Sequence, residues 1–223
     1  IKDDPPLIYH AESLSASSAE VLEAFRLYRS TLPVHRRQLL DHYQLVDLAI
    51  KVVGVGSVGT ICGVALLMAG HEDPLFLQVK QARPSVLEEF VGKSACASSG
   101  ERIVTGCQLM QSASDLFLGW TSARSGRDYY VRQLRDMKLK FPIEDFNPAA
   151  MRQFAEICGW TLARAHARCG EPAQISGYLG KSDKFDRAIA EFSRAYADQT
   201  ESDHEVLIKA VKNGKIEVAA ESG

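Results

Sequence analysis

The amino-acid sequence predicts an α+β fold with two unequal lobes, on the basis of three observations. The segment from Leu45 to Gly70 is apolar and rich in β-branched residues, which favours strands in the middle of the chain. After Pro148, apolar residues recur at helical spacing, which favours helices to the end. A hydrophobic content of 46% with 24% charged residues is typical of a globular protein and argues against a disordered or collagen-like chain.

Residues 1–44 are predicted to form a helical lead-in. Residues 1–16 are polar and contain Pro5-Pro6, which favours an extended segment. Ser17-Ser18-Ala19-Glu20 then predicts the start of a helix that continues to Tyr28, because serine is a good cap for the first N–H groups. A short helix is expected around Arg36–His42.

Residues 45–140 are predicted to form a β-rich lobe, and residues 141–223 a helical lobe. Leu75–Lys80 and Asp128–Leu134 are rich in strand formers. The remaining segments predict helices over Ser85–Phe90, Ile103–Ala113, Pro148–Arg168, Lys184–Thr200 and Asp203–Asn213.

Charge and composition narrow the classes of function. With 26 basic and 28 acidic residues the formal net charge is −2, so no overall field attracts nucleic acid or an anionic membrane. No apolar run approaches the roughly 20 residues of a membrane span. The five cysteines show no C-x-x-C pattern, so we expect reduced thiols, a cytoplasmic protein and no metal site on this chain.

The chain begins at Ile1 and has no methionine before Met68. We therefore expect a processed protein or a segment of a longer one. Its function is then divided between this chain and residues outside it.

A glycine-rich stretch, Val52–Ile61, is the most informative feature of the sequence. It contains G-x-G-x-x-G at Gly54, Gly56 and Gly59, directly after an apolar run. Glycines allow a ligand to approach the backbone closely, and backbone N–H groups can line a phosphate. Two unrelated nucleotide-binding architectures use this pattern, and a plain hairpin turn with an exposed Lys80 is a third interpretation.

In the dinucleotide-binding interpretation, a helix over Thr60–Ala69 begins at the loop and directs its N-terminus at a pyrophosphate. The following strand should then end in an acidic residue, but it ends in Lys80-Gln81. The alternation of strands and helices also stops there. An NAD(P)-dependent oxidoreductase is therefore the second hypothesis.

In the kinase-like interpretation, the glycines lie at the turn of a β-hairpin and cover nucleotide phosphates. The third strand supplies a lysine to the phosphates, and Lys80 ends such a strand. A helical glutamate would hold this lysine, and we expect Glu88, with Glu89 and Glu101 as alternatives. The β-rich lobe is then a kinase-like small lobe with an antiparallel sheet.

Two aspartates resemble kinase catalytic residues, but the spacing of the residues around them does not match the kinase motifs. Asp136 follows an arginine, but the catalytic loop requires an asparagine five residues later, and Asn147 stands eleven residues later. Asp145 precedes Phe146, as in the metal-binding motif of kinases, but the catalytic loop that accompanies this motif is missing. Both aspartates are expected to be surface turn residues.

The order of several motifs resembles one bacterial family, the uncharacterised family known as domain of unknown function 2252. The motifs are Val52–Thr60, Leu77–Glu88, Gln108–Gln111, Phe117–Trp120, Tyr130–Lys138, Gly159–Arg168, Gly177–Gly180 and Tyr196–Thr200. The resemblance is to the C-terminal half of the family and covers the chain from Asp3 onward. One departure is Cys107, where the family is expected to read Gly-Gln-Arg-Leu-Met-Gln, so a basic residue is lost.

The resemblance implies a relative of the kinase-like, aminoglycoside-phosphotransferase fold in a permuted order. A Gly-Asp-x-His-x-x-Asn stretch and a second aspartate motif would lie in an upstream half, and neither occurs in this sequence. The cofactors implied are ATP and Mg²⁺, with metal ligands outside this chain. The site residues implied are the loop residues Gly54, Gly56, Ser57 and Gly59, then Lys80 and Glu88, and the hinge residues Gln133 and Leu134 that meet the adenine.

The leading hypothesis is therefore the nucleotide-binding half of an ATP-dependent phosphotransferase-like protein. Its partners would be a nucleotide, the upstream half of the same protein and a small-molecule or protein substrate, with neither nucleic acid nor membrane. A non-catalytic scaffold of the same shape is the third hypothesis.

Overall fold

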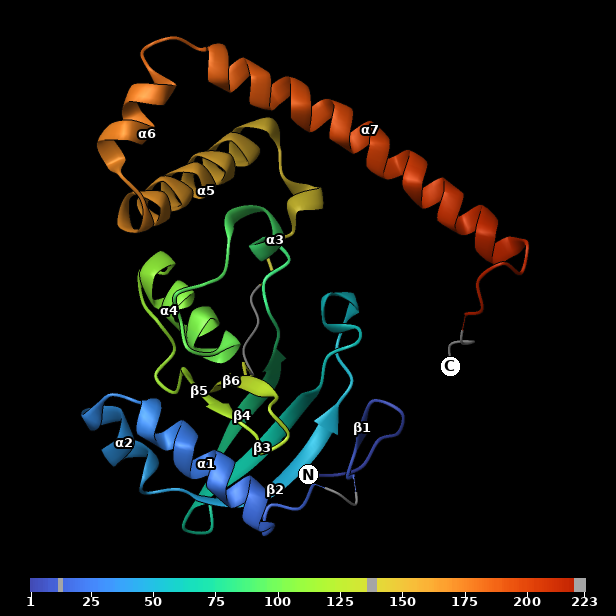
Figure 1. Cartoon of the computed structure of the whole chain (residues 1–223). Helices are drawn as coiled ribbons and strands as arrows, with labels where there is room; N and C mark the ends of the chain where they lie inside the picture. Colours follow the sequence, from blue (N-terminus) through green and yellow to red (C-terminus); the bar gives the residue numbers. More distant parts are fainter. Residues whose placement is uncertain (12–13, 136–139, 219–223) are drawn as a thin grey trace. The chain divides into compact units, whose positions relative to one another are not determined.

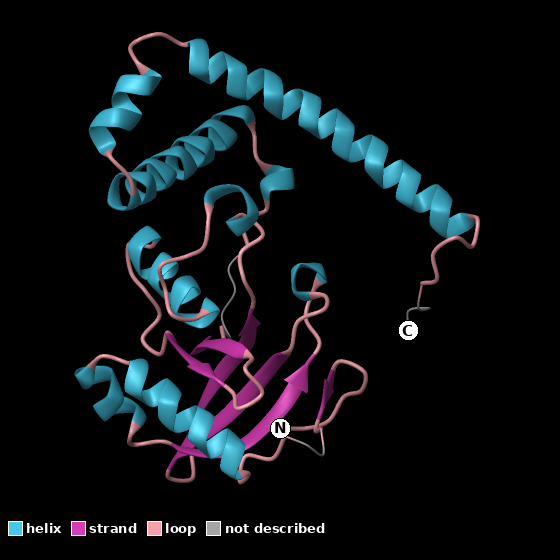
Figure 2. Ribbon diagram, in the orientation of Figure 1, coloured by secondary structure: helices cyan, strands magenta, loops and turns pink. Residues whose placement is uncertain are grey.

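A computed structural model describes residues 1–11, 14–135 and 140–218 (Figures 1 and 2). The chain divides into two compact units, Ile1–Cys169 and Gly170–Gly223. The division at residues 44 and 140 stays a prediction.

In the described part of the first unit, the strands form one sheet in which every neighbouring pair is antiparallel. The order across the sheet is β1-β2-β3-β4-β6-β5. The strands are β1 (Ile8–Tyr9), β2 (Gln44–Lys51), β3 (Cys62–Ala69), β4 (Asp73–Ala82), β5 (Gly119–Ser122) and β6 (Asp128–Gln133). Together with the helices that follow, this sheet confirms the predicted α+β class.

The segment after the glycine loop forms strand β3, not a helix. It lies between β2 and β4, and its Leu67 is fully buried. A central strand that is covered on both faces has apolar residues at nearly every position. The sequence of this segment therefore lacks the alternation of apolar and polar residues that marks a half-exposed strand. The helix that the dinucleotide-binding interpretation requires is therefore not formed.

The helices of the first unit follow the predicted pattern with shifted ends. They are α1 (Ala19–Thr31), α2 (Val34–Leu40), α3 (Glu88–Val91), α4 (Ser99–Met110) and α5 (Pro148–Cys169). Helix α4 begins four residues before the predicted Ile103 because the Ser98 hydroxyl accepts a hydrogen bond from the backbone N–H of Glu101. Helix α3 is only one turn long and starts at Glu88, later than predicted.

Helices α1 and α4 lie on opposite faces of β5, and two glycines make the close contacts. A Cβ atom at Gly119 would come within 3.0 Å of Tyr28, Thr31 and Leu32 of α1. A Cβ atom at Gly100 of α4 would lie 2.6 Å from the carbonyl oxygen of Tyr129 and 2.9 Å from Cβ of Trp120. Since Gly119 and Trp120 are successive strand residues, their side-chain directions point to opposite faces.

The main hydrophobic core lies between α1, α2 and one face of the sheet. Its fully buried side chains include Tyr28, Leu32, Leu40, Leu67 and Leu77. The hydroxyl of Tyr28 donates a 2.7 Å hydrogen bond to the carbonyl of Phe117, so the buried phenol is satisfied.

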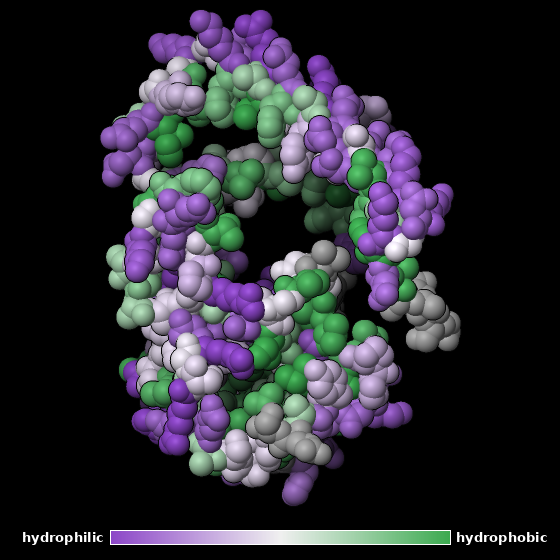
Figure 3. Space-filling model, turned by 45° about the vertical axis from the view of Figure 1, so that its right-hand side comes forward, coloured by the Kyte–Doolittle hydropathy of each residue, from purple (hydrophilic) through white to green (hydrophobic). Residues whose placement is uncertain are grey.

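The second unit contains α6 (Pro172–Leu179) and α7 (Lys184–Lys212). The prediction of separate helices over 184–200 and 203–213 is wrong, because α7 is continuous. No glycine or proline interrupts it, and Gln199 donates a 2.8 Å hydrogen bond to Asp203 across the predicted break. Apolar side chains lie along one side of α7 and charged side chains along the other (Figure 3).

Within the described ranges, no helix combines the length and the apolar character needed to cross a membrane.

Candidate functional site

The glycine loop, residues 52–61, connects β2 to β3 and is folded on itself. A single 3-10 turn covers Val55–Ser57. The backbone N–H of Ser57 donates to the carbonyl of Gly54 at 2.9 Å, and both the N–H and the hydroxyl of Thr60 donate to the carbonyl of Ser57. These local hydrogen bonds fix the shape of the loop.

The three glycines of the motif differ in what the fold requires of them. Gly59 has a φ of +74°, a conformation that residues with a side chain rarely adopt. Gly54 and Gly56 lack a positive φ, and a Cβ atom at either position would meet no described atom within 4 Å. The turn therefore explains Gly59, whereas neither conformation nor packing requires glycine at the other two positions.

Two residues, one near the end of β4 and one just after it, hold the loop through hydrogen bonds, and neither was predicted from the sequence. The side-chain oxygen of Gln81 accepts a 3.1 Å hydrogen bond from the N–H of Ile61, and the guanidinium of Arg83 donates to the carbonyl of Gly59. The carbonyl of Arg83 in turn accepts a 2.8 Å bond from Arg102 of α4. The pattern Lys80-Gln81-x-Arg83, with polar residues continuing past the strand, was the available signal.

Lys80 lies near the end of β4 and contacts the loop directly. Its Nζ donates a 3.1 Å hydrogen bond to the hydroxyl of Ser57, 23 residues earlier in the sequence. In the sheet it is paired with Cys62 of β3 and Tyr130 of β6. Among the described residues, no carboxylate forms an ion pair with its ammonium group.

The glutamates expected to hold Lys80 are engaged locally instead. The carboxylate of Glu88 accepts a 3.2 Å hydrogen bond from the N–H of Ser85. The carboxylate of Glu101 accepts a 2.8 Å hydrogen bond from the N–H of Ala97, just before the start of α4. Glu89 is exposed.

A polar cluster lies on the same face of the sheet as Lys80. Gln78, two residues before it on β4, accepts hydrogen bonds from Nε and Nη2 of Arg132 at 3.1 and 3.0 Å. Its amide also contacts the sulfur of Cys62 at 3.7 Å. Burial raises the pKa of the Cys62 thiol, so it is neutral at neutral pH and takes no part as a thiolate.

The predicted hinge residues lie at the end of β6, but their N–H groups are used within the chain. Both carboxylate oxygens of Asp115 accept from the N–H of Gln133 at 3.2 Å. The N–H of Leu134 donates to the carbonyl of Phe76 at 2.9 Å. The structure therefore brings Ser57 and Lys80 together, while Glu88, Gln133 and Leu134 make other contacts.

A family model described as "Uncharacterized protein conserved in bacteria (DUF2252)" matches residues 1–210 of the chain. The chain belongs to this family. Searches of curated proteins and of solved structures found no match. The family assignment for the DUF2252 chain thus agrees with the resemblance found in its sequence motifs.

The DUF2252 chain places polar groups of Lys80 and Ser57 beside the glycine loop. In the ranges that the structure describes, no three His, Cys, Asp or Glu side chains are grouped as metal ligands. Asp145 is exposed in a short turn, as expected, and Asp136 lies outside the described residues. The groups gathered at the glycine loop are the ammonium group of Lys80, the hydroxyls of Ser57 and Thr60, and the guanidinium group of Arg83.

Proposed function

We propose that the glycine loop and Lys80 bind the phosphates of ATP, and that this chain is the nucleotide-binding half of a phosphotransferase-like protein. The hydrogen bond between Lys80 and Ser57 carries the proposal. Counted from the strand that enters the loop, Lys80 is on the third strand. In kinase-like proteins a lysine on the third strand contacts the phosphates that a glycine-rich loop covers.

The open positions Gly54 and Gly56 support the same proposal. Because neither the conformation nor the packing of the chain requires glycine there, we attribute the missing side chains to close approach by a ligand. The ammonium group of Lys80 would exchange its contact with Ser57 for a phosphate oxygen, and the hydroxyl of Ser57 would then donate to a second oxygen. Positioning and charge neutralisation are the main contributions that phosphoryl transfer needs from a protein.

The described residues do not fit a Mg²⁺ site, since they contain no cluster of metal-ligating side chains. The proposal therefore assigns the Mg²⁺ ligands and the catalytic aspartate to an upstream half of the protein. The absence of a Gly-Asp-x-His-x-x-Asn stretch from this sequence is consistent with that assignment. The substrate would be a small molecule or a protein.

The proposal is tested by measuring ATP and adenosine binding to the full-length protein by calorimetry. We expect Lys80→Ala to weaken ATP binding at least about tenfold and to leave adenosine binding unchanged, because it removes only a phosphate contact. Gly56→Val should also weaken ATP binding without lowering the melting temperature. Lys2→Ala, which removes an exposed lysine near the sheet edge, is the matched control.

Equal ATP affinity in the parent protein and in Lys80→Ala would contradict the proposal. A folded full-length protein that binds no ATP would favour the non-catalytic scaffold instead. The dinucleotide-dependent oxidoreductase has no comparable support, because β3 occupies the place of the helix it needs.

A further inference from the structure

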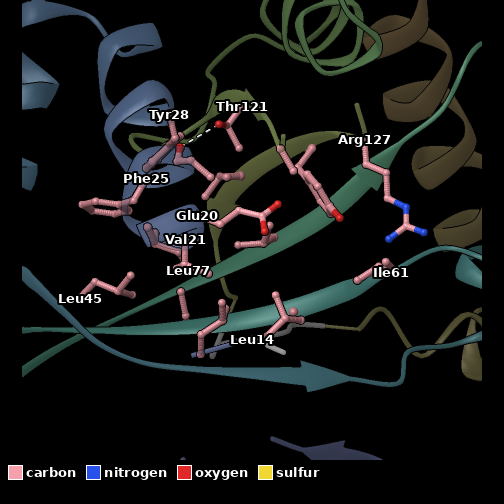
Figure 4. A pocket seen from close by; sticks show the side chains of 18 of the residues that line it. Leu14, Glu20, Val21, Phe25, Tyr28, Leu45, Ile61, Leu77, Thr121 and Arg127 are labelled. Atoms are coloured by element: carbon pink, nitrogen blue, oxygen red, sulfur yellow. Dashed lines mark hydrogen bonds between the residues drawn. The ribbon is translucent and has the colours of Figure 1, made fainter. Parts of the chain in front are cut away.

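An apolar cavity of about 390 Å³ lies between α1 and the sheet, within the first unit (Figure 4). Val21, Ala24 and Phe25 of α1 form one wall. Side chains of β2, β3, β4 and β6 form the floor, among them Leu48, Ala65, Leu77 and Val131. A volume of a few hundred Å³ with mainly apolar walls is typical of a small-molecule site.

The cavity and the glycine-loop site lie on opposite faces of the sheet. Leu77 and Val79 line the cavity, whereas the alternate residues Gln78 and Lys80 point to the other face. A molecule in the cavity would therefore not occupy the space around Lys80. The cavity also reaches Ile61, the first residue after the loop's last turn, so one of its ends adjoins the loop.

Two polar side chains in the cavity wall, those of Thr121 and Tyr28, are neutral and already hydrogen-bonded. The hydroxyl of Thr121 donates a 2.7 Å hydrogen bond to the carbonyl of Ala24, and that of Tyr28 is bonded to Phe117. Burial raises the pKa of Tyr28, which keeps the phenol neutral. Since these polar groups are already satisfied, the interior favours an apolar ligand body without hydrogen-bonding groups.

The two ends of the cavity differ. Phe25 and Leu45 lie at one end, and Arg127 and Ile61 lie at the other (Figure 4). Arg127 follows the β5–β6 turn, and its carbonyl accepts a 2.8 Å hydrogen bond from Ala123, which fixes the backbone there. Its side chain is exposed and makes no ion pair with any described residue, including Glu20 of α1.

We infer that this cavity binds an amphipathic monocarboxylate, with its apolar chain under α1 and its carboxylate on Arg127. A guanidinium group favours a planar carboxylate, with which it forms paired charge-assisted hydrogen bonds. Glu20 lies between the two ends and disfavours a second negative charge along the chain of the ligand (Figure 4). The inference is independent of the proposed nucleotide site, because it uses none of its side chains.

The test measures the binding of decanoate and of decan-1-ol to the full-length protein by calorimetry. The two probes share an apolar chain and differ in the charge of the head group. We expect Arg127→Gln to weaken decanoate binding at least about tenfold and to leave decan-1-ol binding unchanged. The matched control is Arg124→Gln, which removes an exposed arginine from the same turn outside the cavity lining. Val21→Trp, which fills the cavity, should abolish binding of both probes.

Three results would overturn the inference. The first is no decanoate binding by a folded protein. The second is equal weakening by Arg127→Gln and Arg124→Gln, which would indicate general attraction to surface charge. The third is loss of decanoate binding in Lys80→Ala, which would place the acid at the glycine loop. ATP binding is measured separately, so failure of one site leaves the other testable.

Discussion

The two faces of β4 carry different chemistry on one strand. Leu75 and Leu77 are buried in the core that α1 and α2 cover. Gln78 and Lys80 point to the other face, where they bond to Arg132 and Ser57. On that face Phe76 is 38% exposed.

This difference shows that the two faces of one antiparallel sheet are held by different kinds of interaction. The face under α1 contributes mainly by excluding apolar area from water, so its side chains are constrained by volume. The face with Lys80 holds polar groups in fixed positions through hydrogen bonds between neighbouring strands. Substitution of a buried core side chain such as Leu77 should therefore mainly lower stability, whereas substitution of Lys80 should mainly affect the proposed ATP binding.

The largest effect on stability is expected at Leu77, which is 1% exposed. Leu77→Ala should lower the free energy of unfolding by about 2–5 kcal/mol, because it leaves a cavity in the core. Phe76→Ala, its neighbour on the opposite face, should cost clearly less. Urea denaturation of both variants checks this. Equal losses in the free energy of unfolding would show that the two faces contribute equally to stability, and would contradict the comparison.

A smaller effect is expected where α4 approaches the face opposite α1. Gly100→Ala should destabilise by about 1–3 kcal/mol, because the new Cβ atom would lie 2.6 Å from the backbone oxygen of Tyr129 and the helix must shift. Gly106→Ala on the same helix has nothing within 4 Å and should stabilise by about 0.5–1 kcal/mol through helix propensity. Thermal and urea unfolding give both values. If both variants gain stability, α4 is not held closely against the sheet.

One of the three interpretations of the sequence, the kinase-like one, places Lys80 beside the glycine loop, because local signals mark both segments. The G-x-G-x-x-G pattern marks a tight loop, and Lys80 ends an apolar run in the position that the kinase-like pattern requires. Antiparallel pairing of β3 with β4 then brings Lys80 back beside the loop. The α+β class followed in the same way from periodicity.

The partners of the other site residues could not be predicted, because they depend on local competition for hydrogen bonds. The carboxylate of Glu88 accepts a hydrogen bond from the nearby N–H of Ser85 and forms no ion pair with Lys80. Asp115 accepts a hydrogen bond from the N–H of Gln133. The two residues are 18 positions apart, and no sequence pattern marks this contact. The cavity under α1 likewise arises from packing between segments far apart in sequence. By contrast, the spacing Ser98-x-x-Glu101 is typical of a helix start and could have located the start of α4.

The smallest effect is expected at the edge of the sheet, away from both faces. The ring of His10 contacts Asp3 at 2.7 Å and Asp47 of β2 at 3.0 Å, which ties the lead-in to the sheet. The hydrogen bond to Asp3, followed by the contacts with Asp47, raises the pKa of His10 above its ordinary value of 6.5.

Because the pKa of His10 is raised in the folded state, the stabilisation that it supplies is complete below about pH 6.5 and is lost as the pH rises through the higher, folded value. His10→Gln should therefore lower the free energy of unfolding slightly at about pH 5.5, and the difference from the parent protein should disappear at about pH 8.5. Urea denaturation at both values measures this. Subtracting the variant from the parent protein cancels the other titrating groups, so a difference that grows with pH would show that these aspartates do not hold a charged His10.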